Sequence, residues 1–179
     1  MELPAYRFPS PRTITLHMWE KAKDFISKAF SLIFIATIII WFLQTFNYKL
    51  DVVDSSESML TGIGNLIAPI FRPMGFGDWR AATALIGGLT AKEAVVSTLS
   101  VLFGVSSGSL AGVLGQVFSP AAAFAFAVFT LIYTPCVAAM ATVKRELGST
   151  VQMLGVSLYQ TCFAWVISFA AYNLMMLFI

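Results

Sequence analysis

The adjacent residues Lys92 and Glu93 are the first place where this sequence could do chemistry. They lie near the middle of the apolar stretch Ala81–Phe103, just after the pair Gly87-Gly88, which predicts a structural break. A charge near the centre of a bilayer costs about 3 kcal/mol on insertion scales, so ionisable side chains at such depth usually serve a function. Glu93 would then face an ion path, with Lys92 as its charge partner. The alternative is a pair at a helix end that reaches the headgroups or holds two segments together.

A second candidate is the sequence from Tyr133 to Cys136, followed by Met140. Pro135 removes one helical hydrogen bond and frees carbonyl groups near residues 131 and 132. Cys136 and Met140 share a helix face at i, i+4 spacing, and Tyr133 precedes them at i−3. A thiolate, a thioether and free carbonyls beside a carboxylate suit a borderline transition ion such as Fe²⁺. The alternative is a small packing cysteine beside an ordinary proline kink of a membrane helix.

Other chemistry has little support in the residues. His17 is the only histidine, and Cys162 sits among apolar residues as packing, so neither indicates a metal centre. The sequence contains no Gly-x-x-x-x-Gly-Lys-Ser/Thr loop for nucleotide phosphates and no Ser/His/Asp arrangement. The sequence therefore predicts neither an enzyme nor a permanently bound cofactor.

The composition defines the class of protein that positions these residues. Of 179 residues, 58% are hydrophobic and 11% are charged, whereas soluble domains carry about 25% charged residues. A soluble fold of this length could not bury so much apolar surface, so the solvent is the lipid bilayer. The net charge of +2 is too small to indicate a nucleic-acid partner. The prediction is an all-α, polytopic membrane helical bundle with broken or re-entrant helices.

Apolar runs and their interruptions predict the elements of this bundle. A cytoplasmic juxtamembrane lead-in at 1–24 precedes a transmembrane domain at 25–179, with spans at about 25–45, 120–143 and 151–178, a short inserted element at 59–77, and a re-entrant or broken helix at 80–103. The first 28 residues contain five Lys or Arg residues, which places the N-terminus in the cytoplasm. If 80–103 re-enters instead of crossing, Lys144 and Arg145 are cytoplasmic as well.

Several motifs, taken in order, resemble one known family, ferrous iron transport protein B (FeoB). They are Met1–Pro9, Trp19-Glu20-Lys21, Ala68–Gly75, Asp78–Ala82, Gly88–Val96, Leu131–Ala138 and Lys144-Arg145-Glu146. The resemblance implies Fe²⁺ uptake across a bacterial or archaeal cytoplasmic membrane, with this chain as the second of two inverted gate repeats. It also implies that Cys136, and less directly Glu93, line the iron path. We expect Met140 and Tyr133 to form the adjacent wall.

The resemblance also implies what accompanies these residues. Family members begin with a GTP-binding G domain and a first gate repeat, which this sequence lacks, so the chain corresponds to a fragment or to half of a split transporter. GTP would be bound only by that missing N-terminal domain. Expected partners are those two domains, a small FeoA-like protein, further copies of the chain and the lipid bilayer.

Two other functions remain open at this point. A gate-type fold could move nucleosides or other small organic solutes, although the membrane runs offer few amide side chains for sugar hydroxyls: Gln152, Gln160 and Asn173. The chain could also be a membrane assembly module that transports nothing.

Overall fold

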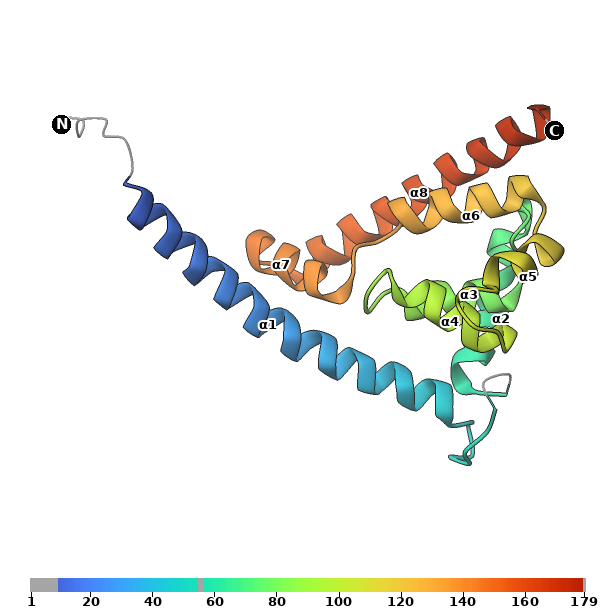
Figure 1. Cartoon of the computed structure of the whole chain (residues 1–179), viewed down its shortest axis with the longest axis horizontal. Coiled ribbons are helices and arrows are strands. Elements are labelled where there is room, and N and C mark those ends of the chain that lie inside the picture. The colour runs from blue at the N-terminus through green and yellow to red at the C-terminus, as the bar shows by residue number, and fades with distance from the viewer. Residues whose placement is uncertain (1–9, 55–56, 179) are drawn as a thin grey trace.

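A computed structural model describes residues 10–54 and 57–178, which are almost entirely helical (Figure 1). The elements in chain order are α1 (Pro11–Thr45), α2 (Met59–Phe71), the 3₁₀ helix η1 (Arg72–Met74), α3 (Trp79–Gly87), α4 (Ala94–Phe103), α5 (Leu110–Val117), α6 (Pro120–Ile132), α7 (Val137–Leu147) and α8 (Thr150–Phe178). The only β pairing within the described residues is an isolated bridge between Phe46 and Val52. The predicted all-α class is confirmed.

Local side chains determine where several helices begin and end. The Asp78 carboxylate accepts a hydrogen bond of 2.7 Å from a backbone N–H in the first turn of α3, and the Ser119 hydroxyl accepts one of 3.2 Å at the start of α6. Pro120, the first residue of α6, has no N–H to leave unsatisfied. Gly104 and Gly148 follow α4 and α7 with φ of 65° and 66°, left-handed values that glycine adopts without strain.

The longest packed pair is α6 against α8, which lie side by side (Figure 1). The buried Ser168 hydroxyl of α8 donates a hydrogen bond of 2.6 Å to the Ala125 carbonyl of α6. Within the described residues, α8 alone has the length and composition to cross a membrane, and α5 with α6 would supply a second span if this pair, bent by 115°, crosses together. The apolar helical stretches Ile33–Thr45 and α4 are shorter.

The expected lead-in and first span form one helix. α1 runs without interruption from Pro11 to Thr45, so no structural boundary falls near residue 24. Large apolar side chains such as Trp19, Phe30 and Trp41 are exposed along it. Residues 1–9 of the expected lead-in, which include the first family motif, lie outside the described residues.

Two expected segments each consist of two helices. The stretch 80–103 contains α3 and α4, separated by residues 88–93, and the stretch 120–143 contains α6 and α7, separated by residues 133–136. The interruption in 120–143 falls at Pro135, where the sequence predicts a loss of helical hydrogen bonding. The backbone of Cys136 is extended, with φ of −63° and ψ of 160°, the usual conformation of the residue that precedes the first turn of a helix. The expected inserted element 59–77 contains α2 and η1.

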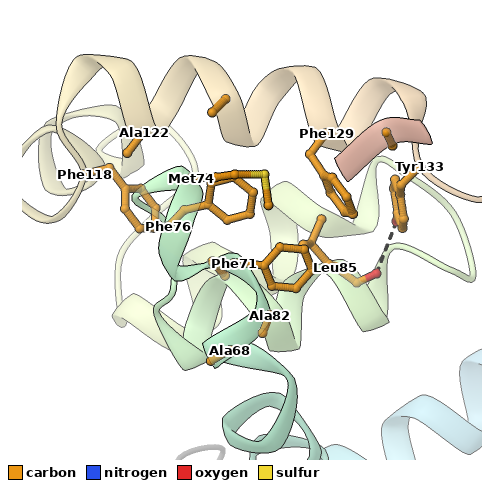
Figure 2. Close-up of a cluster of buried hydrophobic side chains, with 13 residues drawn as sticks. Ala68, Phe71, Met74, Phe76, Ala82, Leu85, Phe118, Ala122, Phe129 and Tyr133 are labelled. Atoms are coloured by element: carbon orange, nitrogen blue, oxygen red, sulfur yellow. Dashed lines mark hydrogen bonds between the residues drawn. The ribbon is translucent and has the colours of Figure 1, made fainter. Parts of the chain in front are cut away.

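An aromatic cluster fixes the end of α6 against α2 and η1 (Figure 2). The Phe129 ring lies edge-on to Phe71 at 5.1 Å between centroids, and it stacks on Tyr133 at 5.5 Å. Phe76 is fully buried and stacks on Phe71 at 5.2 Å. These contacts hold the last turn of α6, and with it the break that follows, in a defined position.

Candidate functional site between two helix breaks

The break after α3 and the break after α6 contact each other directly. The backbone N–H of Val137 donates a hydrogen bond of 2.8 Å to the Leu89 carbonyl. The buried Tyr133 hydroxyl donates one of 3.2 Å to the Leu85 carbonyl, shown by the dashed line in Figure 2. Two interruptions that the sequence places far apart therefore form one site. Irregular backbone at membrane depth is tolerated where protein buries it or where it lines a polar cavity.

Lys92 reaches across this contact to the end of α6. Its ammonium donates hydrogen bonds of 2.8 Å to the Leu131 carbonyl, 39 residues further along the chain, and 3.3 Å to the Tyr133 carbonyl. The ammonium also lies 5.0 Å from the centroid of the Tyr133 ring. From α8, the side-chain amide of Gln160 donates 3.1 Å to the Ile132 carbonyl. Side chains thus satisfy three successive carbonyl groups that the helix no longer pairs.

Cys136 and Met140 lie on the other side of the break. Cys136 precedes the first residue of α7 and is half-buried as a free thiol, and its side chain makes no hydrogen bond to the helix terminus. Met140 is half-buried one turn later in α7. Tyr133 does not share their helix face, because the chain is not helical between α6 and α7. The Cys136 thiol is close enough to the Lys92 ammonium for the two groups to interact electrostatically.

Glu93 separates from Lys92. Its side chain is exposed, and within the described part of the chain its carboxylate has no ion pair or hydrogen bond. Lys92 is half-buried and turned into the site. The structure therefore brings Lys92, Tyr133 and Cys136 together and leaves Glu93 at the outside.

The two glycines of the first break permit close approach. A side-chain carbon on Gly88 would overlap the Tyr133 hydroxyl and a methyl group of Val95. One on Gly87 would come within 2.9 Å of the Thr98 hydroxyl. Gly88 therefore lies where the two breaks meet, whereas Gly87 lies where α3 packs against α4.

The sequence did not predict the part that two further residues take at the breaks, Gln160 and Thr134. Gln160 pairs with a freed carbonyl, and an amide inside an otherwise uncharged helix is a signal that sequence reasoning can use. The Thr134 hydroxyl is buried and has no hydrogen-bond partner among the described residues. It lies between Tyr133 and Pro135, so the unpaired oxygen belongs to the break itself.

The side chains present could supply part of a coordination shell. No three His, Cys, Asp or Glu side chains come together in the residues that the structure describes. A transition ion here would rely on the Cys136 thiolate, the Met140 thioether and backbone carbonyl oxygens, with the remaining ligands coming from water or from another segment.

Replacing Tyr133 by phenylalanine tests the link between the breaks. We expect the free energy of unfolding to fall by about 1 kcal/mol, because one buried hydrogen bond is lost while the ring still stacks on Phe129. SDS-induced unfolding of the purified chain in micelles, followed by circular dichroism, measures this change. Tyr159→Phe is the matched control, since that side chain is 71% exposed on α8. Equal effects of the two substitutions would contradict the assigned hydrogen bond.

Several known proteins are similar in sequence to this chain. The Gate family, described as nucleoside recognition, matches residues 26–150. The Fe(2+) transporter FeoB of Methanocaldococcus jannaschii is 36% identical over 94% of this chain, and that of Staphylococcus aureus strain MSSA476 is 34% identical over all of it. An Fe(2+) transport protein A/Fe(2+) transporter FeoB fusion protein of Porphyromonas gingivalis is 31% identical over 99% of the chain.

These similarities concern one part of the relatives. The chain spans about a quarter of the length of the curated relatives that it matches, from 26% to 27% in these three proteins. No solved structure is significantly similar to it.

Proposed function

Since this chain belongs to the Gate family, we propose that it forms part of the membrane domain of a ferrous iron uptake transporter, with the ion path at its paired helix breaks. The fold is a helical membrane fold, and relatives similar over nearly the whole chain are named as Fe(2+) transporters.

One observation carries the proposal: two discontinuous helices meet break to break. The contact joins Leu89 to Val137 and Leu85 to Tyr133 through hydrogen bonds. Transporters commonly bind ions where broken helices present unpaired carbonyls and half-helix ends near the bilayer midplane. A packing kink alone would not require a second broken helix, nor a lysine directed at its carbonyl groups.

We assign the residues of the site as follows. Cys136 is the soft ligand or gate on the path, because a thiolate suits Fe²⁺ better than it suits Mg²⁺ or Ca²⁺. Met140 and Tyr133 form the adjacent wall. Glu93, exposed beside the first break, attracts the cation at the approach to the site rather than within it.

The remaining steps of transport belong to other segments. GTP binding and hydrolysis are assigned to a G domain outside this chain, because the matched residues are those of the Gate. A first gate repeat would supply the facing half of the path, and a second copy could complete an oligomer. The Porphyromonas gingivalis relative, which joins transport protein A to FeoB in one polypeptide, supports a small FeoA-like partner. The location would be a bacterial or archaeal cytoplasmic membrane, with the N-terminus inside.

Nucleosides fit this site less well. Gln160 uses its amide on the Ile132 carbonyl, and Asn173 donates to the Phe169 carbonyl of its own helix at 2.8 Å. Two of the few amides that could bind sugar hydroxyls are therefore engaged by backbone.

Uptake of ⁵⁵Fe²⁺ under anaerobic conditions tests the proposal. The chain would be co-expressed with a G domain and first gate repeat in bacteria that lack their own ferrous importer. We expect uptake to require the chain and to fall by about tenfold or more in Cys136→Ser. Replacing a residue that only hydrogen-bonds to a metal ligand typically lowers metal affinity or activity by about tenfold or more, and replacing a ligand should cost at least as much.

Cys162→Ser is the matched control, because this second free cysteine is exposed on α8. It should transport like the parent at equal membrane levels. Uptake that is unchanged by both substitutions would assign Cys136 a packing role and leave the transporter assignment in place. Uptake of radiolabelled uridine but not of iron would reject the ferrous assignment.

A further inference from the structure

The Lys92 ammonium occupies the position that a bound cation would take at the end of α6. It lies 2.8 Å from the Leu131 carbonyl oxygen and 3.3 Å from the Tyr133 carbonyl oxygen. The C-terminal end of a helix carries a partial negative charge that favours cations. Carbonyl oxygens are also suitable ligands for divalent metal ions. The end of α6 is therefore a cation site that the chain fills with its own side chain.

We propose that Lys92 is a tethered cation, which holds the carbonyl end of α6 in the absence of metal and is displaced when a divalent cation binds there. This inference rests on the proposed function, because it takes the ion path to run past the break. It makes Lys92 a gating residue that competes with the transported ion, in addition to the ligands assigned above.

Displacement is compatible with the way in which the breaks are joined. The hydrogen bonds from Val137 to Leu89 and from Tyr133 to Leu85 connect the two segments without any contribution from Lys92. The lysine can therefore leave without separating the breaks. A lysine that served only to cross-link them would duplicate contacts already present.

The ammonium is also held in a way that a divalent ion can overcome. Within the described residues it has no carboxylate partner. It contacts two neutral carbonyls and the ring of Tyr133, and the Cys136 thiol lies close enough to interact with it electrostatically. A divalent ion interacts with the same dipoles through twice the charge. It would also repel the ammonium at this distance, so simultaneous occupancy is strongly disfavoured. The flexible four-carbon stem of a half-buried lysine gives the amine room to move.

Chemical labelling of Lys92 in the parent protein tests the proposal directly. Membrane vesicles containing the chain and its co-expressed partner domains would be acetylated with acetic anhydride under anaerobic conditions, with and without Fe²⁺, and analysed by mass spectrometry. We expect Fe²⁺ to raise the acetylation of Lys92 several-fold, because the amine is released from the carbonyl groups. Lys144, exposed in the last turn of α7, is the internal control and should not change.

A substitution provides an independent measurement. In Lys92→Leu the competing charge is gone and no new metal ligand is introduced, so the dissociation constant for ⁵⁵Fe²⁺ should fall, by about tenfold if the amine occupies the site nine-tenths of the time. Lys92→Arg keeps the charge and should bind no more tightly than the parent, and Lys144→Leu should bind as the parent does.

The possible outcomes separate this inference from the proposed function. Iron binding with unchanged or reduced acetylation of Lys92 would overturn the tethered cation and leave the transporter assignment intact. A dissociation constant that is equal or higher in Lys92→Leu would do the same. Absence of iron binding in the parent and in Lys92→Leu alike would overturn both. Binding that appears only in Lys92→Leu would support the inference strongly, because the amine would then be the sole obstacle.

Discussion

Replacing Phe129 by alanine is expected to lower the free energy of unfolding by about 3 kcal/mol, the lower end of the range for truncating a buried phenylalanine. The ring is 2% exposed and contacts Phe71, Phe76 and Tyr133. Lipid tails are as apolar as the protein interior, so the loss comes from packing and from the cavity left behind rather than from transfer out of water. SDS-induced unfolding in micelles measures the change.

Phe124→Ala is the matched control on the same helix. Its side chain is 46% exposed on α6, so the same truncation removes little packing and should stay within about 0.5 kcal/mol of the parent. Similar losses for Phe129 and Phe124 would contradict the central position of the aromatic cluster. A selective loss at Phe129 would show that the end of α6 is held by these rings.

The different environments of these two phenylalanines could not be predicted from the sequence. Phe124 and Phe129 lie in the same uncharged helix, and a helix that is apolar all round has no polar face from which to read its orientation. The membrane class and the helical composition follow directly from the scarcity of charge. Which aromatic rings face protein and which face outward depends on neighbouring helices.

The sequence indicates where the two helix breaks lie, but it does not indicate that they contact each other. Pro135 and the glycine pair before Lys92 indicate where two helices stop, because proline lacks a donor and glycine favours an end or a close approach. Nothing in either motif indicates that the two breaks touch. The partners of Lys92 are backbone carbonyl groups, which every residue possesses and which therefore leave no trace in the sequence. Only the tertiary arrangement shows that Lys92 is the residue turned into the site and Glu93 the one left outside.

The contact between the breaks leads to the second large effect, at Gly88. Its backbone has helical angles, φ of −65° and ψ of −11°, which any residue can adopt, so glycine is needed only for space. An added methyl group would overlap the Tyr133 hydroxyl and a methyl group of Val95, and would lie 3.4 Å from the Leu85 carbonyl oxygen. Gly88→Ala should therefore lower the free energy of unfolding by about 1–3 kcal/mol through overpacking and reduce ⁵⁵Fe²⁺ uptake.

Gly155→Ala is the matched control, because a methyl group there meets nothing within 4 Å on α8. It should be neutral or stabilise the helix by up to about 1 kcal/mol. A double-mutant cycle sharpens the argument further. In the Tyr133→Phe background the overlapping hydroxyl is gone, so Gly88→Ala should cost less than it does in the parent. Strictly additive effects on the free energy of unfolding would mean that a side chain at position 88 does not overlap the Tyr133 hydroxyl. A double variant that loses less stability than the sum of the two single variants would establish, by measurement, that the two helix breaks meet at this point.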